Sequence, residues 1–540
     1  MIWRKWLVIG WIGWLWVGCK GAPSSPPASD FAGAYLPLML SPQSTPTPSP
    51  TPAPLRLALV ADLPPELAQA AQDLADAQPQ VFAISQSEVA DVRLGVGAGQ
   101  PLAQWVYAVA APFATTADAI TQAEVLAAWR GEGARMVLDG ETAVTLTPLL
   151  GPPADSIAIV SPADLADALW QARPAITLLP FHRLTPELKV LAVDSASPLD
   201  AAFDAAAYPF VVDVGVMGSE TAVTTLLSAW TGPPTNRDPA KLTTVALTGV
   251  TALVRGTAFQ MEYNGVLYPG EAVAPILQAA DIAHVSNEVS FSPDCPFPDP
   301  MGGTSFCSRE SYFDLLLHLG VDVVELTGNH VNDWGTAVFA HTLDLYDAAG
   351  LAYFGGGRDA ADAAQPALFT HNGNRIAFVG CNWVGPNYAW ATAVSPGSRP
   401  CDDSFFAQIM QLKDEGYVVL ATLQYQELYY YQPSAQQAVD FARVAAAGAT
   451  AVSGSQGHHV QGFAFADGAF IHYGLGNLFF DQMEQMGTRQ TLVDQYVVYD
   501  GRLLSVQLWS GLIENYARPR EMTPAERQQL LLTLFQASGW

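Results

Sequence analysis

Short apolar runs alternate with longer amphipathic segments along most of this chain. Residues 56–60 and 105–110 have the length and composition of strands, and residues 65–77 and 121–131 have helical spacing. After residue 241 the alternation becomes more regular. It predicts strands over 245–247, 282–285, 321–326, 376–379, 418–423 and 450–452, and helices ending at 280, 320, 349 and 447. The fold class predicted from this pattern is α/β.

Two changes in composition divide the chain. Residues 22–54 are mostly Pro, Ser, Thr and Ala, which cannot bury a core and favour extended backbone, so they predict a tether. Residues 231–240 are rich in turn residues and mark a boundary between two folded regions. The predicted parts are a signal over 1–19, a tether over 20–54, an α/β domain over 55–235, a second domain over 241–515 and a C-terminal helical cap over 516–540.

The start of the chain has the features of an export signal. Arg4 and Lys5 precede 13 apolar residues that end at Gly18, and Cys19 follows directly. This arrangement resembles the lipobox of bacterial lipoproteins, with Trp16 where leucine is usual. We therefore expect an exported protein, lipid-anchored at the extracytoplasmic face of the cell membrane through Cys19. A plain signal peptide or an uncleaved anchor is the alternative.

Charge and composition exclude several classes of function. Half of the residues are hydrophobic, which excludes a mainly disordered protein. No internal stretch approaches the roughly 20 apolar residues that span a bilayer. The net charge of −27, from 51 acidic and 24 basic residues, repels nucleic acid, and we expect no nucleic-acid partner.

The four cysteines after the signal form two close pairs, Cys295 with Cys307 and Cys381 with Cys401. In an exported chain this spacing predicts two local disulfides, although three connectivities are formally possible. The chain has no CxxC motif and no Cys/His spacing typical of zinc sites.

Four polar clusters follow predicted strands of the second domain. They lie at residues 286–288, 327–335, 454–459 and 474–482. Because ligand sites of α/β folds form at the carboxyl ends of strands, we expect the clusters to converge. Glu288, the Asn329–His330 pair and the His458–His459 pair are donors typical of a metal-assisted hydrolase. An isolated histidine is more often a packed or surface residue, so the clustering carries this prediction.

In order and spacing the clusters resemble the CapA family of capsule (poly-γ-glutamate) synthesis proteins. Ser-Asn-Glu at 286–288 is similar to its NLE-like motif, and Gly-Asn-His-Val-Asn-Asp-Trp-Gly at 328–335 to its NNHxxDxG motif. Gly-Ser-Gln-Gly-His at 454–458 and Leu-Gly-Asn-Leu-Phe-Phe-Asp-Gln at 475–482 are similar to its GHHPHxxQ and LGNFxFDQ motifs. The resemblance spans residues 245–482. It implies a calcineurin-like metallophosphatase fold, a β-sandwich flanked by helices, and a role in making or exporting an envelope polymer.

The resemblance also implies roles for individual residues. They are catalysis for His330 and Asp333, metal binding for Glu288, Asn329 and His458, and substrate binding for Glu427, His459 and Asn477. The alternative for Asn329 and His330 is hydrogen bonding that fixes the loop after the strand.

Several positions depart from the family pattern. Val250 replaces an aspartate that resembles a metal ligand, Gln424 replaces a histidine, and Ser455 and Gln456 replace two more. A two-metal centre needs a bridging carboxylate and about three ligands for each ion. We therefore expect one weakly held divalent cation of unknown identity, or none, and not a full dinuclear site.

The first α/β domain is similar to phosphate-type periplasmic substrate-binding proteins over residues 106–113, 120–131 and 188–194. The Ser/Thr/Gly loops with which such receptors hold an oxyanion at helix N-termini are not evident. A structural or partner-docking module is the alternative for this domain.

Three functions are compatible with these features. The first is a CapA-like envelope protein with a degraded metal site, whose partners are an envelope polymer or the proteins that synthesise it. The second is an active metal-dependent hydrolase of phosphoesters or polymer amides. The third is a solute-binding lipoprotein. The sequence leaves open whether the protein is an enzyme.

Overall fold

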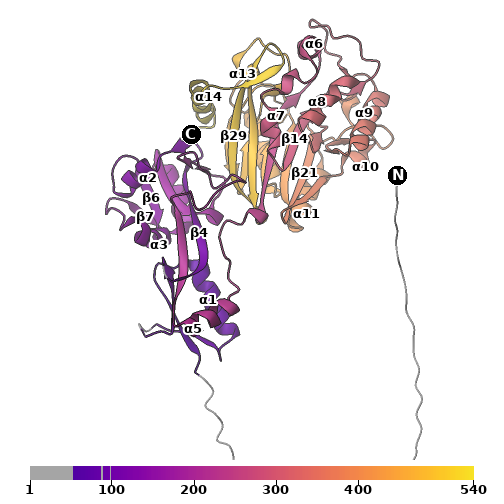
Figure 1. The fold of residues 1–540 in the computed structure, drawn as a ribbon. Helices are drawn as coiled ribbons and strands as arrows, with labels where there is room; N and C mark the ends of the chain where they lie inside the picture. Colours follow the sequence, from indigo (N-terminus) through magenta and orange to yellow (C-terminus); the bar gives the residue numbers. More distant parts are fainter. Residues whose placement is uncertain (1–52, 87–88, 98, 456) are drawn as a thin grey trace, which may run out of the picture. The chain divides into compact units, whose positions relative to one another are not determined.

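A computed structural model describes residues 53–86, 89–97, 99–455 and 457–540 (Figure 1). The predicted signal, the tether and Cys19 lie outside the described residues. Residues 53–540 form one compact unit that contains two groups of sheets. Within the described ranges, no helix has both the length and the apolar character needed to cross a membrane.

The first domain is built on a nine-stranded sheet in the order β2-β1-β3-β11-β4-β8-β6-β7, with β9 paired to β4. Its strands are β1 (Leu55–Leu59), β2 (Phe82–Ile84), β3 (Val92–Val96), β4 (Gln100–Pro112), β6 (Arg135–Asp139), β7 (Ala158–Val160), β8 (Ala175–Pro180), β9 (Leu188–Val190) and β11 (Val211–Gly218). A separate pair is β5 (Ala119–Ile120) with β10 (Ala192–Val193). Its α-helices are α1 (Pro65–Ala77), α2 (Gln122–Trp129), α3 (Gly140–Leu150), α4 (Leu165–Gln171) and α5 (Glu220–Ala229).

The long strands β4 and β11 run antiparallel in the middle of this sheet. Strands β1, β2 and β3 are parallel to one another on one side, and β6, β7 and β8 are parallel on the other. Trp105, Tyr107 and Trp129 are fully buried in one apolar cluster that covers both sides. The domain is therefore two parallel α/β halves joined through an antiparallel centre.

The second domain contains two large sheets. The first has the order β18-β17-β14-β12-β28-β29-β30, with β13 and β27 attached, and the second has the order β20-β21-β23-β24-β26-β25. The strands of the first are β12 (Leu242–Thr248), β13 (Val250–Thr251), β14 (Ile282–Asn287), β17 (Val323–Glu325), β18 (Ala352–Phe354), β27 (Asn477–Phe479), β28 (Gln490–Tyr499), β29 (Arg502–Glu514) and β30 (Arg518–Glu521). Those of the second are β20 (Ala367–His371), β21 (Asn374–Asn382), β23 (Val418–Gln424), β24 (Ala451–Ser453), β25 (Phe463–Ala466) and β26 (Ala469–His472). The small pairs are β15 (Phe291–Ser292) with β16 (Ser308–Arg309), and β19 (Gly356–Gly357) with β22 (Gly397–Ser398).

Helices cover the outer faces of both sheets. The α-helices are α6 (Arg255–Asn264), α7 (Ala274–Gln278), α8 (Phe313–His318), α9 (Thr336–Ala349), α10 (Ala360–Ala363), α11 (Asp403–Asp414), α12 (Ala435–Ala446), α13 (Met486–Arg489) and α14 (Pro524–Ala537). The inner faces of the two sheets share one apolar cluster, which contains Val245 of the first sheet and Leu420 of the second. Helices α6–α9 share a second cluster with the first sheet, and α11 and α12 share a third with the second sheet. The result is a helix–sheet–sheet–helix sandwich, which confirms the predicted α/β class and β-sandwich.

Two predicted helices are shorter than expected. Residues 308–320 begin as strand β16, because Ser308 pairs with Phe291 beside a disulfide, and the helix starts only at Phe313. The cap expected over 516–540 is helical only from Pro524. Residues Asn515 and Tyr516 have φ values of 49° and 64°, which reverse the chain into the β29–β30 hairpin.

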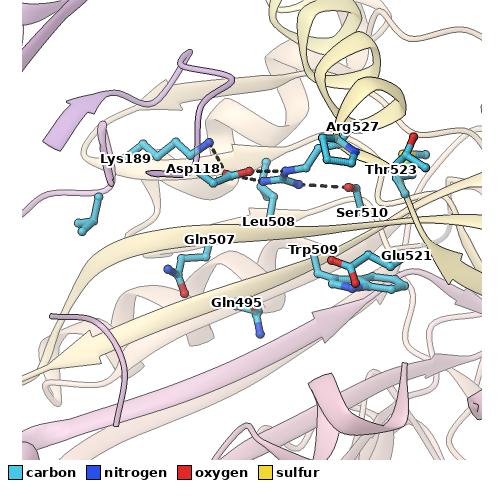
Figure 2. A pocket seen from close by; sticks show the side chains of 13 residues that line it. Asp118, Lys189, Gln495, Gln507, Leu508, Trp509, Ser510, Glu521, Thr523 and Arg527 are labelled. Carbon is cyan, nitrogen blue, oxygen red and sulfur yellow. Dashed lines mark hydrogen bonds and ion pairs between the residues drawn. The ribbon is translucent and has the colours of Figure 1, made fainter. Parts of the chain in front are cut away.

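The two domains share a core and an ion-pair network. Phe113 of the first domain lies with its ring centre 5.3 Å from those of Phe463 and Phe470 in the second. Asp118 accepts hydrogen bonds from Arg527 at 2.7 and 2.8 Å and forms an ion pair with Lys189 at 2.6 Å. These charged groups are among the residues that line a pocket of about 700 Å³, and Figure 2 shows Asp118 lying between Lys189 and Arg527. Contacts of both kinds fix the first domain to the second.

Candidate functional site

Polar side chains gather where strands of both sheets end. Glu288 directly follows β14, and its backbone N–H donates to the Thr251 carbonyl at 3.1 Å. His330 follows β17, Glu427 follows β23, and His458 follows β24. The parallel strands run in the same direction, so these side chains meet at one edge of the sandwich, as the sequence predicts.

Glu288 is the centre of this group. It is 1% exposed, and neither carboxylate oxygen has a hydrogen-bond partner among the described residues. The Nε2 atom of His330 lies 3.9 Å from Oε1 of Glu288, beyond hydrogen-bonding distance. Burial raises the pKa of Glu288 above its usual value, and the charges of His458 and His330 offset this only in part. A buried carboxyl group without hydrogen bonds lowers the stability of the folded protein. Glu288 is therefore the group in this site that most needs a binding partner.

Asp333 orients His330. The Nδ1 atom of His330 lies 2.6 Å from Oδ2 of Asp333, which also accepts the backbone N–H of Phe306 at 2.9 Å. The hydroxyl of Tyr388 donates to the other oxygen of Asp333 at 3.2 Å. An ionised carboxylate only accepts hydrogen bonds, so Nδ1 carries a proton and Nε2 is directed to Glu288. Burial lowers the pKa of His330, but Asp333 and Glu288 outweigh burial and raise it.

Asn477 and Glu427 orient His458. The Nδ1 atom of His458 lies 2.7 Å from Oδ1 of Asn477, whose amide nitrogen donates to the Thr488 carbonyl at 2.9 Å. Asn477 is therefore an acceptor here, and Nδ1 of His458 is its donor. The Nε2 atom of His458 lies 3.5 Å from Oε1 of Glu427. The hydrogen bond from His458 outweighs the effect of burial and holds the pKa of Glu427 at about 2.

An apolar wall stands where the family pattern has an aspartate. Val250 is fully buried in a cluster with Ala252, Val254, Val289, Phe306 and Phe480. The ring of Phe306 lies 4.5 Å from the ring of His330, and the ring of Phe480 stacks on His458 at 5.1 Å. These contacts hold the two imidazole rings in place. Because residue 250 is valine, this wall offers them no carboxylate.

The donor set does not fit a dinuclear metal centre. In the part of the chain that the structure describes, no group of three or more His, Cys, Asp and Glu side chains is arranged to hold a metal ion. The Oδ1 atom of Asn329 already accepts a hydrogen bond from Gln424 at 3.1 Å. Both oxygens of Glu288 remain without a hydrogen-bond partner among the described residues.

The structure brings together most residues predicted for the site. Glu288, His330, Asp333, Glu427, His458 and Asn477 form this group, and Asn329 lies beside Gln424. His459 does not belong to it, because its buried ring packs against Tyr431 at 4.5 Å. A Cβ atom at Gly487 would lie 1.7 Å from Nε2 of His459, so this ring fills the space above a glycine.

Sequence reasoning missed Arg255, Tyr388 and the two phenylalanines of the wall. Arg255 is the last residue of the segment 249–255, which aligns with the first motif of the family. This alignment is the only feature of the sequence that could have drawn attention to Arg255. Both predicted disulfides are present, Cys295–Cys307 and Cys381–Cys401, and the structure selects this connectivity from the three possibilities.

Comparisons with known proteins agree with this geometry. The second domain is a two-sheet α/β sandwich with a carboxylate–imidazole site at its strand ends. Residues 244–482 match the family model described as bacterial capsule synthesis protein PGA_cap. This match and the two curated relatives described next support the bacterial capsule synthesis (CapA) family for the C-terminal half of the chain.

Two curated relatives cover this region. The capsule biosynthesis protein CapA of Bacillus anthracis is 29% identical over 180 residues, 32% of this chain and 44% of that protein. The PGA biosynthesis protein CapA of Bacillus subtilis (strain 168) is 25% identical over 228 residues, 42% of this chain and 59% of that protein. The chain thus spans about half the length of the curated relatives that it matches.

Solved structures resemble each part only distantly. A 5′-nucleotidase precursor from Thermus thermophilus aligns with a TM-score of 0.33 and 15% identity over 55% of this chain and 59% of its own. An ABC-type phosphate transport receptor from Vibrio cholerae aligns with a TM-score of 0.29 and 10% identity over 33% of this chain and 93% of its own. At these TM-scores the two likenesses support no conclusion.

Proposed function

We propose that this protein is a CapA-like cell-envelope protein that acts in the synthesis or export of a capsule polymer of the poly-γ-glutamate type. The family match of residues 244–482 supports the process, and the site supports a direct contact with polymer. The observation that carries the proposal is Glu288, a fully buried carboxylate whose oxygens have no hydrogen-bond partner among the described residues. A fold accepts this cost where a ligand, a cation or a proton meets the group.

The chain's own residues can bind and move protons at this site. His330 is held by Asp333 and His458 by Asn477, so each presents Nε2 beside a carboxylate and can exchange a proton there. If a divalent cation binds, the oxygens of Glu288 would contribute to holding it, with further ligands supplied by polymer or water, and it would supply Lewis-acid polarisation of a carbonyl or phosphoryl oxygen. Glu427, which lines the opposite side of His458, is available to an incoming amide or hydroxyl group.

An active metal-dependent hydrolase is the second candidate. It is favoured by the tautomers of the two histidines, because a protonated Nδ1 held by a neighbouring oxygen is the usual arrangement of a metal-binding imidazole. It is opposed by Val250, Gln424 and Ser455, which replace potential ligands. A solute-binding lipoprotein receives less support, since side chains of the first domain already cap the N-termini of α2, α3 and α5.

Export and lipid anchoring through Cys19 are part of the proposal. The two disulfides support an extracytoplasmic location, because such bonds persist in oxidising compartments. An anchored protein would hold the site outside the membrane, where a growing polymer emerges.

The first test separates a scaffold from a hydrolase. Residues 55–540 would be purified, and bound transition metal would be measured by elemental mass spectrometry in the wild type and in a His330→Ala/His458→Ala variant. His371→Ala, a half-exposed histidine outside the site, is the matched control. Near-stoichiometric metal that only the double variant loses would favour the hydrolase. Background metal in all three proteins would favour a scaffold.

The second test addresses the polymer. We expect purified poly-γ-glutamate to co-sediment with the wild-type protein at an ionic strength that screens the repulsion between the acidic protein and the acidic polymer, and to bind the double variant more weakly. Equal sedimentation of wild type with and without polymer would contradict the proposed function.

A further inference from the structure

Arg255 packs against the two phenylalanine rings that also contact the site histidines. Its guanidinium carbon lies 4.8 Å from the ring centre of Phe480 and 5.2 Å from that of Phe306. The same two rings contact His458 and His330. Arg255 is therefore one side chain away from both imidazoles, on the far side of the wall.

The guanidinium is fixed but incompletely hydrogen-bonded. Nη2 of Arg255 donates to Oδ1 of Asp481 at 2.5 Å, and Oδ2 of Asp481 accepts the backbone N–H of Gly256 at 2.8 Å. Nε of Arg255 is buried without a partner among the described residues. The backbone of Arg255 has a φ of 44°, a conformation that non-glycine residues rarely adopt and that often marks functional positions. The fold thus holds this donor in place and leaves part of it unused.

A small pocket lies next to Arg255. Its volume is about 160 Å³, and Arg255, Phe306, Arg309, Trp334 and the loop between Cys295 and Cys307 line it. Ligand pockets usually measure about 300–1,000 Å³, so this one accommodates a single chemical group of a longer ligand. The Cys295–Cys307 disulfide closes the loop that lines the pocket.

Two aromatic side chains in the lining of the pocket are exposed to solvent. Phe297 is 57% exposed and Trp334 is 39% exposed, although both are large hydrophobic side chains. Asp299 also lines the pocket, with one carboxylate oxygen accepting the backbone N–H of Met301 at 2.9 Å. A guanidinium and exposed aromatic rings in one lining suit a negatively charged group carried on a short hydrocarbon spacer.

We propose that this pocket is a subsite for a carboxylate side group of an acidic polyamide chain, with Arg255 as its binding residue. This inference rests on the proposed function and names the chemical feature of the polymer that the site recognises. The carboxylate would meet the guanidinium at its unpartnered Nε, the methylene spacer would contact Phe297 and Trp334, and the polymer backbone would lie outside the pocket. Asp481 competes with the ligand for the same guanidinium.

The test uses a γ-linked tetraglutamate as the probe and isothermal titration calorimetry on residues 55–540. We expect Arg255→Gln to weaken binding at least tenfold and Arg255→Lys to weaken it less, because lysine keeps the charge without the planar fork. Asp481→Asn should strengthen binding several-fold, since it removes the competing carboxylate. Arg130→Gln, at an exposed arginine of the first domain, is the control and should bind as the wild type does. Circular dichroism melts would show that each variant is folded.

Two further probes identify the anion. Inorganic phosphate and glycerol phosphate would be titrated in the same way, and we expect weaker binding than for tetraglutamate. Tighter binding of either phosphate, lost in Arg255→Gln, would overturn the carboxylate assignment. Equal affinity of wild type and Arg255→Gln for tetraglutamate, or no binding to either, would overturn the subsite. If full-length polymer still bound both proteins, the proposed function would stand while the subsite failed.

Discussion

Two glutamates illustrate how differently the two domains use the ends of their strands. Glu66 lies in the first turn of α1, after β1, and Glu288 follows β14. One oxygen of Glu66 accepts hydrogen bonds from Arg183 at 2.7 and 3.1 Å and lies 2.9 Å from Nε2 of His182. Arg183 also donates to Glu141 at 2.6 Å, which ties α1 to α3. Neither oxygen of Glu288 has such a partner among the described residues.

The pKa values of the two glutamates shift in opposite directions for this reason. Burial alone raises the pKa of a carboxyl group, and it does so for both. For Glu66, the hydrogen bonds from His182 and Arg183 outweigh burial and hold the pKa at about 2. For Glu288, burial dominates and the pKa is raised.

The two domains therefore differ in how they satisfy acidic side chains near their strand ends. In the first domain, Asp139 also caps α3 by accepting the Thr142 backbone N–H at 2.8 Å, so the protein's own carboxylate occupies a helix N-terminus where an oxyanion would bind. In the second domain, the buried carboxyl group of Glu288 has no hydrogen-bond partner among the described residues. Such a site costs stability, and proteins retain this cost where function requires it.

The largest expected effect concerns whether the two regions form one cooperative unit. Phe113 is 2% exposed and packs among aromatic residues of the other domain. We expect Phe113→Ala to lower the free energy of unfolding by about 3–4 kcal/mol, because it leaves a cavity in a shared core. Urea denaturation followed by tryptophan fluorescence would measure it, with Leu532→Ala, at a half-exposed position, as the control. Two separate transitions in the wild type would contradict a shared core.

The next effect tests the structural role of Glu66. We expect Glu66→Gln to destabilise the protein by about 2 kcal/mol, because Arg183 and His182 lose their charged acceptor. Glu132→Gln, at an exposed position in the same domain, should change stability by less than about 0.5 kcal/mol. A stability of Glu66→Gln equal to that of the wild type would remove the basis of the comparison.

The same residue predicts a dependence on pH. The folded pKa of Glu66, about 2, lies below its ordinary value of 4.5. Its contribution is therefore complete above pH 4.5 and is lost as the pH falls toward 2. Acid titrations of wild type and Glu66→Gln should converge over this range, whereas a constant gap between them would show that the charge of Glu66 is not involved.

The smallest expected effect has the opposite sign. Glu288→Gln replaces a buried carboxyl group that has no hydrogen-bond partner among the described residues by a neutral amide of similar shape, so we expect the free energy of unfolding to rise by about 1 kcal/mol. Thermal denaturation of the metal-free proteins, with Glu132→Gln as the control, measures the change. A clear loss of stability would mean that Glu288 is a structural residue like Glu66.

The sequence by itself determined the α/β class, the family of the C-terminal half and the residues at its strand ends. The reason is that strand periodicity and the motifs at 286–288, 328–335 and 475–482 are local features of the sequence. They do not depend on contacts between distant residues. The spacing of the cysteines likewise indicated two local disulfides.

Only the tertiary structure decided which of those side chains act together. His458 and His459 are neighbours in the sequence, yet one reaches Glu427 and the other packs against Tyr431. Arg255 lies against Phe306 and Phe480, which are distant from it in the sequence, only in the folded chain. The opposite environments of Glu66 and Glu288 depend on whether an arginine from another strand end lies within hydrogen-bonding distance. Long-range packing sets that distance, and no local pattern in the sequence encodes it.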